Sequence, residues 1–177
     1  MAELLPSTKL SIQDFVNLLY PYAKYTQDNT GISAIAILSQ AALESGWNSS
    51  SPGWAYFGVK WNESVGGDRQ LLQTTEYMST PDVQFPEVIS VTPIDRNGEI
   101  IYKYIIKDWF RKYNSPDECF TDHADYFFRN QRYSEALQVK EDPYAFFQEI
   151  ARAGYATDPN YANLLTSIAN RISQFIA

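Results

Sequence analysis

Apolar residues recur with a helical period at both ends of the chain and with a strand-like period in the middle. Ser11 and Asp14 resemble a capping box, and the apolar spacing that follows them predicts a first helix. Pro21 lies in this segment and is expected to kink or end the helix. Residues 33–45 predict a second helix that ends at Gly46, because glycine suits the C′ position.

The second predicted helix has almost no polar face, which is typical of a central helix that is buried on most sides. Its polar exceptions are Ser39, Gln40 and Glu44. Gln40 and Glu44 lie one turn apart on the same face, since residues at i and i+4 are neighbours on a helix. These exceptions are therefore the first candidates for a functional role.

The middle of the chain predicts a small antiparallel sheet inserted between helices. Residues 70–78, 88–92 and 99–106 are rich in threonine and apolar residues. Asn97 and Gly98 separate the last two runs, and Asn-Gly between apolar runs is typical of a hairpin turn.

The last third returns to a helical period. Ser115, Pro116 and Glu118 suit the N-cap, N1 and N3 positions of a helix. Further helices are predicted over residues 134–139, from Asp142 and Pro143 to Gly154, and from Thr157, Asp158 and Pro159 onward.

The predicted fold class is α+β, mainly α. A chain of 177 residues suits a single domain that buries its own core. We expect one domain over residues 1–177, with a helical lobe at about 1–57 and 114–177 and a β-lobe insertion at about 58–113.

Composition excludes several chemistries. One His and one Cys are too few for a Cys/His zinc cluster or a disulfide framework, so no metal or other cofactor is expected. The net charge of −7 would repel phosphates, so no nucleic-acid partner is expected. No apolar run approaches a membrane span, and residues 1–6 lack the pattern of a signal peptide. Carboxylates remain as the acid–base groups.

Cys119 and His123 lie one helical turn apart, which is the spacing of a thiol–imidazole pair in a cysteine peptidase. Both lie beside an apolar face with Phe120 and Phe127. A buried free thiol and a histidine with a satisfied hydrogen bond are therefore predicted instead.

Glu44 is the first candidate for catalysis. Desolvation and the negative end of the helix dipole both disfavour an ionised carboxylate at this position. A carboxyl that stays protonated near neutral pH can act as a general acid. The alternative is that Glu44 reaches solvent past the helix end, or pairs with a Lys or Arg.

Aromatic residues make up 15% of the chain, and their apolar faces and polar edges suit sugars. Candidates for sugar stacking follow the second helix, although two or three of them are expected to be core: Trp47, Trp54, Tyr56, Phe57 and Trp61. Lys60 is a candidate to hydrogen-bond a sugar or a peptide carboxylate, with a solvated lysine as the default. Gln40 is a further substrate-binding candidate.

Five segments resemble one known family. Residues 40–47 (QAALESGW) resemble the ALESGW signature of peptidoglycan-cleaving N-acetylglucosaminidases of glycoside hydrolase family 73, a group that includes flagellar rod-associated wall hydrolases, autolysins and phage lysins. Residues 57–60 (FGVK), 74–77 (TTEY), 110–115 (FRKYNS) and 154–161 (GYATDPNY) resemble further family motifs in the same order. Five motifs in register are far more specific than any one of them.

The resemblance implies a lysozyme-like helical lobe and a small antiparallel β-hairpin lobe that form a substrate groove. It implies hydrolysis of the β-1,4 bond between N-acetylglucosamine and N-acetylmuramic acid, within the glycan strands of bacterial peptidoglycan. Glu44 would be the catalytic acid, Glu76 the second carboxylate, and Tyr155 a groove tyrosine close to Glu44. Glycoside hydrolysis ordinarily needs two such carboxyls.

Other interpretations of these residues stay open. Glu76 on an alternating strand could be a solvent-facing charge, and Tyr155 could be a packing or capping residue. Residues 79–107 form a longer insert than short family members have. Glu63, Asp68 and Asp82 are nearby acids that could replace Glu76.

The predicted function is that of an endo-β-N-acetylglucosaminidase, expected to be a monomer. It would act at the bacterial cell wall, in the periplasm, outside the cell or after release by a phage. The alternatives are a lytic transglycosylase that uses Glu44 alone and a non-catalytic wall-binding module.

Overall fold

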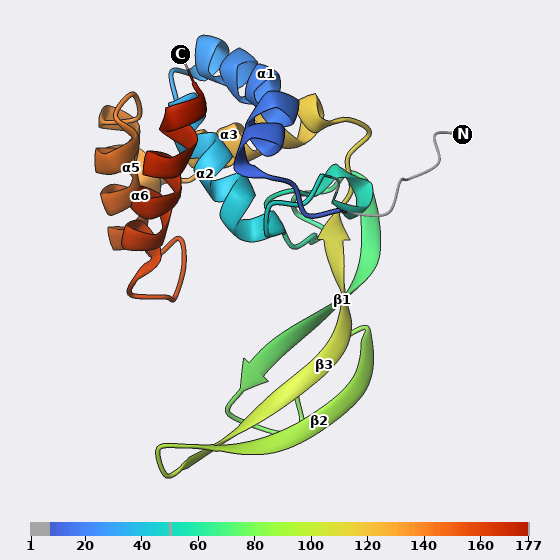
Figure 1. Cartoon of the computed structure of the whole chain (residues 1–177). Helices are drawn as coiled ribbons and strands as arrows, with labels where there is room; N and C mark the ends of the chain where they lie inside the picture. Colours follow the sequence, from blue (N-terminus) through green and yellow to red (C-terminus); the bar gives the residue numbers. More distant parts are fainter. Residues whose placement is uncertain (1–7, 50, 177) are drawn as a thin grey trace. The chain divides into compact units, whose positions relative to one another are not determined.

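The computed structural model describes residues 8–49 and 51–176, which form two compact units (Figure 1). The helical unit holds the chain up to Phe57 and from Tyr113 onward, and the β unit is Gly58–Lys112. Residues 1–6, which were expected not to form a signal peptide, lie outside the described residues. No helix in the described part of the chain is long and apolar enough to cross a membrane.

Helix α1 (Ile12–Thr30) begins as predicted, with Ser11 Oγ accepting the Asp14 amide proton at 3.1 Å. It does not end at Pro21, which lies inside the helix on an exposed position. The buried positions continue at helical spacing on both sides of the proline: Phe15, Val16, Leu19, Ala23 and Thr26. Their packing therefore favours a continuous helix despite the hydrogen bond that proline cannot make.

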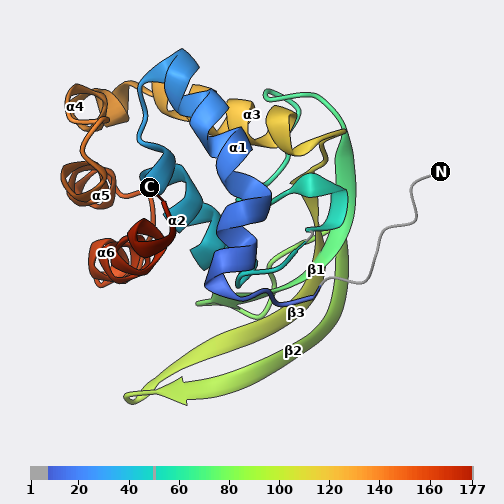
Figure 2. The same ribbon diagram turned by 45° about the horizontal axis from the view of Figure 1, so that its top comes forward.

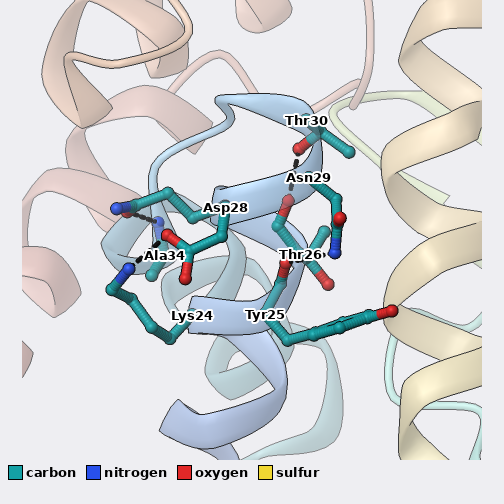
Figure 3. Close-up of polar contacts among 8 residues, drawn as sticks. Lys24, Tyr25, Thr26, Asp28, Asn29, Thr30 and Ala34 are labelled. Atoms are coloured by element: carbon teal, nitrogen blue, oxygen red, sulfur yellow. Dashed lines mark hydrogen bonds and ion pairs between the residues drawn. The ribbon is translucent and has the colours of Figure 1, made fainter.

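Side-chain hydrogen bonds close the C-terminal end of α1 and connect it to the next helix (Figure 3). Thr30 Oγ1 donates to the carbonyl of Thr26 at 2.7 Å. Gly31 ends the helix with a φ of 78°, a left-handed conformation that glycine adopts without steric cost. The Ala34 amide then donates to Gln27 Oε1 at 2.7 Å, which joins the end of α1 to the first residue of the second helix.

Helix α2 (Ala34–Ser45) is the central helix of its unit, as predicted. Ser33 caps its N-terminus, and Gly46 ends it with a φ of 64°. It packs against α1, α5 (Pro143–Arg152) and α6 (Tyr161–Ile172), as Figures 1 and 2 show. The sequence from Ala34 to Ala42 is buried except for Ile35, so polar groups here need partners inside the protein.

The remaining helices follow the predicted punctuation closely. Helix α3 (Pro116–Arg129) begins after Ser115, whose hydroxyl accepts the Glu118 amide proton. Helix α6 starts later than predicted, because Asp158 accepts the Asn160 amide proton in a turn that precedes the helix. The short elements are η1 (Pro52–Trp54), η2 (Gln131–Tyr133), α4 (Ser134–Gln138) and η3 (Ser173–Phe175).

The β unit contains a three-stranded antiparallel sheet of β1 (Arg69–Met78), β2 (Glu87–Arg96) and β3 (Glu99–Arg111), with β3 in the middle (Figure 1). The predicted hairpin is confirmed, since Asn97 and Gly98 have positive φ between β2 and β3. Strands β2 and β3 end four and five residues later than predicted, at Arg96 and Arg111. Pro93 is tolerated because β2 is an edge strand. The α+β, mainly α class is confirmed.

Candidate active site

Glu44 lies in the last turn of α2, and its side chain is exposed. Within residues 8–49 and 51–176, no side chain forms a hydrogen bond or ion pair with its carboxyl. The surrounding protein nevertheless removes part of its hydration, and this desolvation raises the pKa of Glu44 above its usual range. The direction of this shift agrees with the predicted effect of desolvation. The exposed side chain agrees with the alternative that Glu44 reaches solvent past the helix end, whereas a Lys or Arg partner is not observed among the described residues.

Two tyrosines of the helical unit lie within electrostatic range of Glu44. Burial raises the pKa of Tyr155, and the neighbouring Tyr161 and Glu44 add to this effect. The rings of Tyr155 and Tyr161 are stacked, with centroids 5.6 Å apart, and Tyr155 also stacks with Phe127 at 5.6 Å. The structure thus gathers Tyr155 with Glu44, together with Tyr161, which the sequence analysis did not single out as a site residue.

A buried hydrogen-bonded chain lies one turn below Glu44. Gln40 Nε2 donates to Tyr161 Oη at 3.1 Å, and Gln40 Oε1 lies 2.9 Å from His123 Nε2. Burial lowers the pKa of His123 to about 3, so the ring is neutral and donates its Nε2 proton to Gln40. Gln40 has no exposed surface, and its prediction as a substrate-binding residue is therefore wrong.

Two aromatic candidates are also core residues. Tyr56 is 1% exposed, and its hydroxyl donates to the Ser49 carbonyl at 3.0 Å. Phe57 is 5% exposed and stacks on His123 with ring centroids 3.6 Å apart. Substrate contact by Tyr56 or Phe57 is therefore excluded by burial, as the expectation that two or three of the aromatics are core had allowed. The buried thiol of Cys119 is confirmed as well.

Trp47 and Trp61 keep part of their surface accessible. Trp47 packs edge-on against Phe15 at 5.2 Å in the helical unit. In the β unit, the Arg69 guanidinium lies over the rings of both Trp61, at 4.3 Å, and Trp109, at 4.1 Å. Because Arg69 covers its ring, Trp61 offers less stacking surface than the sequence suggested.

Glu76 lies on β1 opposite Tyr104 of β3, a residue that is 1% exposed. Thr74, Glu76 and Met78 are less exposed than the alternate residues of the strand, so Glu76 projects from the more buried face of the sheet. The solvent-facing alternative is therefore not observed. The other acids considered, Glu63, Asp68 and Asp82, are all exposed.

Lys60 connects Glu76 to a second carboxylate. Its Nζ lies 2.7 Å from Glu76 Oε1 and 2.5 Å from Asp108 Oδ2. Partial burial opposes the charge of Lys60, but the hydrogen bonds and charges of Asp108 and Glu76 outweigh it and raise the pKa of Lys60. The prediction that this ammonium binds a sugar or a peptide carboxylate is thus replaced by an internal ion-pair role. Sequence reasoning missed Asp108, because the predicted strand ended at residue 106.

Comparisons with known proteins identify the class and then the family. The family model named Glucosaminidase, described as mannosyl-glycoprotein endo-beta-N-acetylglucosaminidase, matches residues 20–174. The protein is therefore a glycoside hydrolase. It belongs to the glucosaminidase family, as the five motifs had indicated.

Curated relatives include the peptidoglycan hydrolase FlgJ of Vibrio parahaemolyticus, which is 31% identical over 92% of this chain and 48% of its own length. A probable N-acetylmuramidase of Lactococcus lactis subsp. lactis is 28% identical over 93% of this chain and 34% of its own length. The chain thus spans less than half of these relatives.

Among solved structures, the glycoside hydrolase domain of Salmonella typhimurium FlgJ in a C-terminally truncated form is similar, with a TM-score of 0.65 and 30% identity. That match covers 93% of this chain and 99% of the other. A peptidoglycan hydrolase mutant from Sphingomonas sp. A1 has a TM-score of 0.66 and 26% identity, covering 93% and 97%. These similarities confirm a lysozyme-like fold of this family.

Replacement of Gln40 by leucine is expected to lower the free energy of unfolding by about 2–4 kcal/mol, because it leaves polar groups of His123 and Tyr161 buried without a partner. Urea denaturation at pH 7 measures this change. Gln148→Leu, at an exposed position of α5, is the matched control and should stay within about 0.5 kcal/mol of wild type. An equally small effect of Gln40→Leu would contradict the assigned role.

Replacement of Glu44 by glutamine is expected to stabilise the protein at neutral pH. The raised pKa means that ionised Glu44 is less favourable in the folded state than in the unfolded state. This penalty is present above the folded-state pKa and vanishes as the pH falls below the unfolded value of about 4.3. Melting temperatures at pH 7 and pH 3.5 test this, with the exposed Glu141→Gln as control. An equal gain at both pH values would contradict the prediction.

Proposed function

We propose that this protein is an endo-β-N-acetylglucosaminidase that hydrolyses the β-1,4 bond between N-acetylglucosamine and N-acetylmuramic acid in bacterial peptidoglycan. The observation that carries the proposal is Glu44, at the end of the central helix of a glucosaminidase-family protein. Its carboxyl has a raised pKa and no hydrogen-bond or ion-pair partner among the residues that the structure describes. The FlgJ relatives are named peptidoglycan hydrolases, which supports glycan strands of the cell wall as the substrate and the wall as the place of action.

Glu44 acts as the general acid in this proposal. Its carboxyl gives a proton to the glycosidic oxygen while the bond from that oxygen to the anomeric carbon breaks. Because the raised pKa keeps more of Glu44 protonated at a given pH, the proton is available to the leaving group. Tyr155, whose ring is held by stacking on Phe127, is proposed to orient Glu44 or the N-acetyl group of the substrate.

Glu76 is the second carboxylate in this proposal. It must be ionised, either to take a proton from the attacking water or to attack the anomeric carbon itself. The Lys60 ammonium lies 2.7 Å from Glu76 Oε1 and is the cation beside this carboxylate. Trp47 and Trp54 are the half-buried aromatic candidates for a sugar contact in the helical unit, since Tyr56 and Phe57 are buried.

The sugar at the newly formed chain end tests the reaction. Digestion of purified sacculi by wild type is expected to release reducing-end N-acetylglucosamine, measured by mass spectrometry after borohydride reduction. Glu44→Gln is expected to lower kcat by about 10²–10⁴-fold, because general acid catalysis contributes this much. The exposed Glu141→Gln is the matched control and should keep wild-type activity.

Other products would identify other functions. Reducing-end N-acetylmuramic acid would indicate the activity for which the Lactococcus relative is named. Anhydromuramic ends would indicate a lytic transglycosylase that needs Glu44 alone. Binding to sacculi without any new chain end would indicate a wall-binding module.

A further inference from the structure

Asp108 is the most firmly held member of the cluster formed by Lys60, Glu76 and Asp108. Its Oδ1 accepts the Trp109 amide proton at 2.8 Å, and its Oδ2 lies 2.5 Å from Lys60 Nζ. Its side chain is 19% exposed, compared with 30% for Glu76 and 44% for Lys60. Asp108 therefore has both oxygens engaged, one by its own strand and one by the lysine.

Lys60 is fixed to β3 by its backbone as well as by its side chain. The residue forms an isolated β-bridge with Phe110, and the adjacent Trp61 amide donates to the Trp109 carbonyl at 2.9 Å. Its Nζ also lies 5.4 Å from the centroid of the Phe110 ring. The ammonium thus comes from a segment bound to β3 and reaches Glu76 on the neighbouring strand.

The register of the sheet explains why both carboxylates reach one lysine. Asp108 pairs with Leu72, and Glu76 pairs with Tyr104. Because side chains alternate between the two faces of a strand, Asp108 and Glu76 project from the same face of the sheet, with one residue pair of that face between them. Within the β unit, the titratable groups that share this face near Glu76 include Lys60, Asp108, Tyr104 and Tyr102, the last of which pairs with Met78. The Tyr104 hydroxyl is occupied, since it donates to the Thr80 carbonyl at 3.0 Å.

We propose that Asp108 is a positioning residue that competes with Glu76 for the Lys60 ammonium, so that Lys60 orients Glu76 Oε1 without holding it as a full ion pair and leaves the second carboxylate oxygen of Glu76 free for the reaction. This inference rests on the proposed role of Glu76. Asp108 also adds a negative charge that shares the ammonium with Glu76. The balance of one cation against two carboxylates then sets how readily Glu76 takes up a proton.

Two substitutions have effects of opposite sign in this arrangement. Lys60→Met removes the cation and leaves two carboxylates to repel each other, so the acid limb of the kcat/KM profile moves to higher pH. Asp108→Asn keeps the shape and the hydrogen bond from Trp109, but it turns an amide nitrogen toward Lys60 and removes the competing charge. Lys60 then pairs with Glu76 alone, so the acid limb moves to lower pH. Each displacement is expected to be on the order of one pH unit, the low end for opposite charges at this distance. A purely structural role would not produce opposite displacements.

The experiment records kcat and KM from pH 3 to pH 8 on solubilised glycan strands with wild type, Lys60→Met, Asp108→Asn and Glu76→Gln. Lys107→Met is the matched control, because Lys107 projects from the other face of β3 and pairs with Glu87 at 2.9 Å. A ¹³C NMR titration of the Glu76 carboxyl in the whole protein reads the same displacement without substrate. Asp108→Asn is close to isosteric and serves if Lys60→Met does not fold.

Opposite displacements in both readouts, with Lys107→Met unchanged, would support the inference. Displacements of the same sign, or none for Asp108→Asn, would overturn it. If Glu76→Gln loses turnover but Lys60→Met and Asp108→Asn show no such displacements, Glu76 keeps its proposed role as the second carboxylate and only the positioning role of Asp108 is rejected. Full turnover in Glu76→Gln would instead reject the role of Glu76 on which the inference rests, whatever the NMR titration shows.

Discussion

Burial of α2 on almost every side is the constraint on which the helical unit depends. A helix in this position offers its neighbours apolar surface, and any polar group on it must find a partner within the protein. Gln40 meets this requirement with one hydrogen bond to His123 on α3 and one to Tyr161 on α6. Three helices are thereby held in one arrangement one turn below Glu44, where the apolar packing gives way to solvent.

The two carboxylates proposed for catalysis differ because their surroundings differ. Glu44 has no cation beside it within the described residues, and desolvation disfavours its charge. Glu76 has the Lys60 ammonium at 2.7 Å. Glycoside hydrolysis needs one carboxyl that gives a proton and one that acts as a base or nucleophile, and the two surroundings differ in the presence of this cation.

Patterning along the sequence predicts elements whose physical causes are local. The caps at Ser11 and Ser115 and the turn at Asn97 and Gly98 depend on neighbouring residues, and all of them are confirmed. Pro21 was expected to kink or end the helix, and an end there is wrong, because the tertiary packing of α1 outweighs one missing hydrogen bond. Gln40, Tyr56 and Phe57 were candidates for sugar contact because a sequence does not distinguish a polar or aromatic group facing the core from one facing solvent.

Asp108 shows why the candidate site could be predicted only in part. Motifs pointed to Glu76 and Lys60, but neither motif contains the residue that joins them. That relation depends on strand register, which brings Asp108 and Glu76 to one face of the sheet although they lie 32 positions apart in the chain. Lys60 turns from a sugar-binding candidate into a bridge because both carboxylates reach it. The surroundings of Glu76 are therefore a property of three segments folded together, and no single motif specifies them.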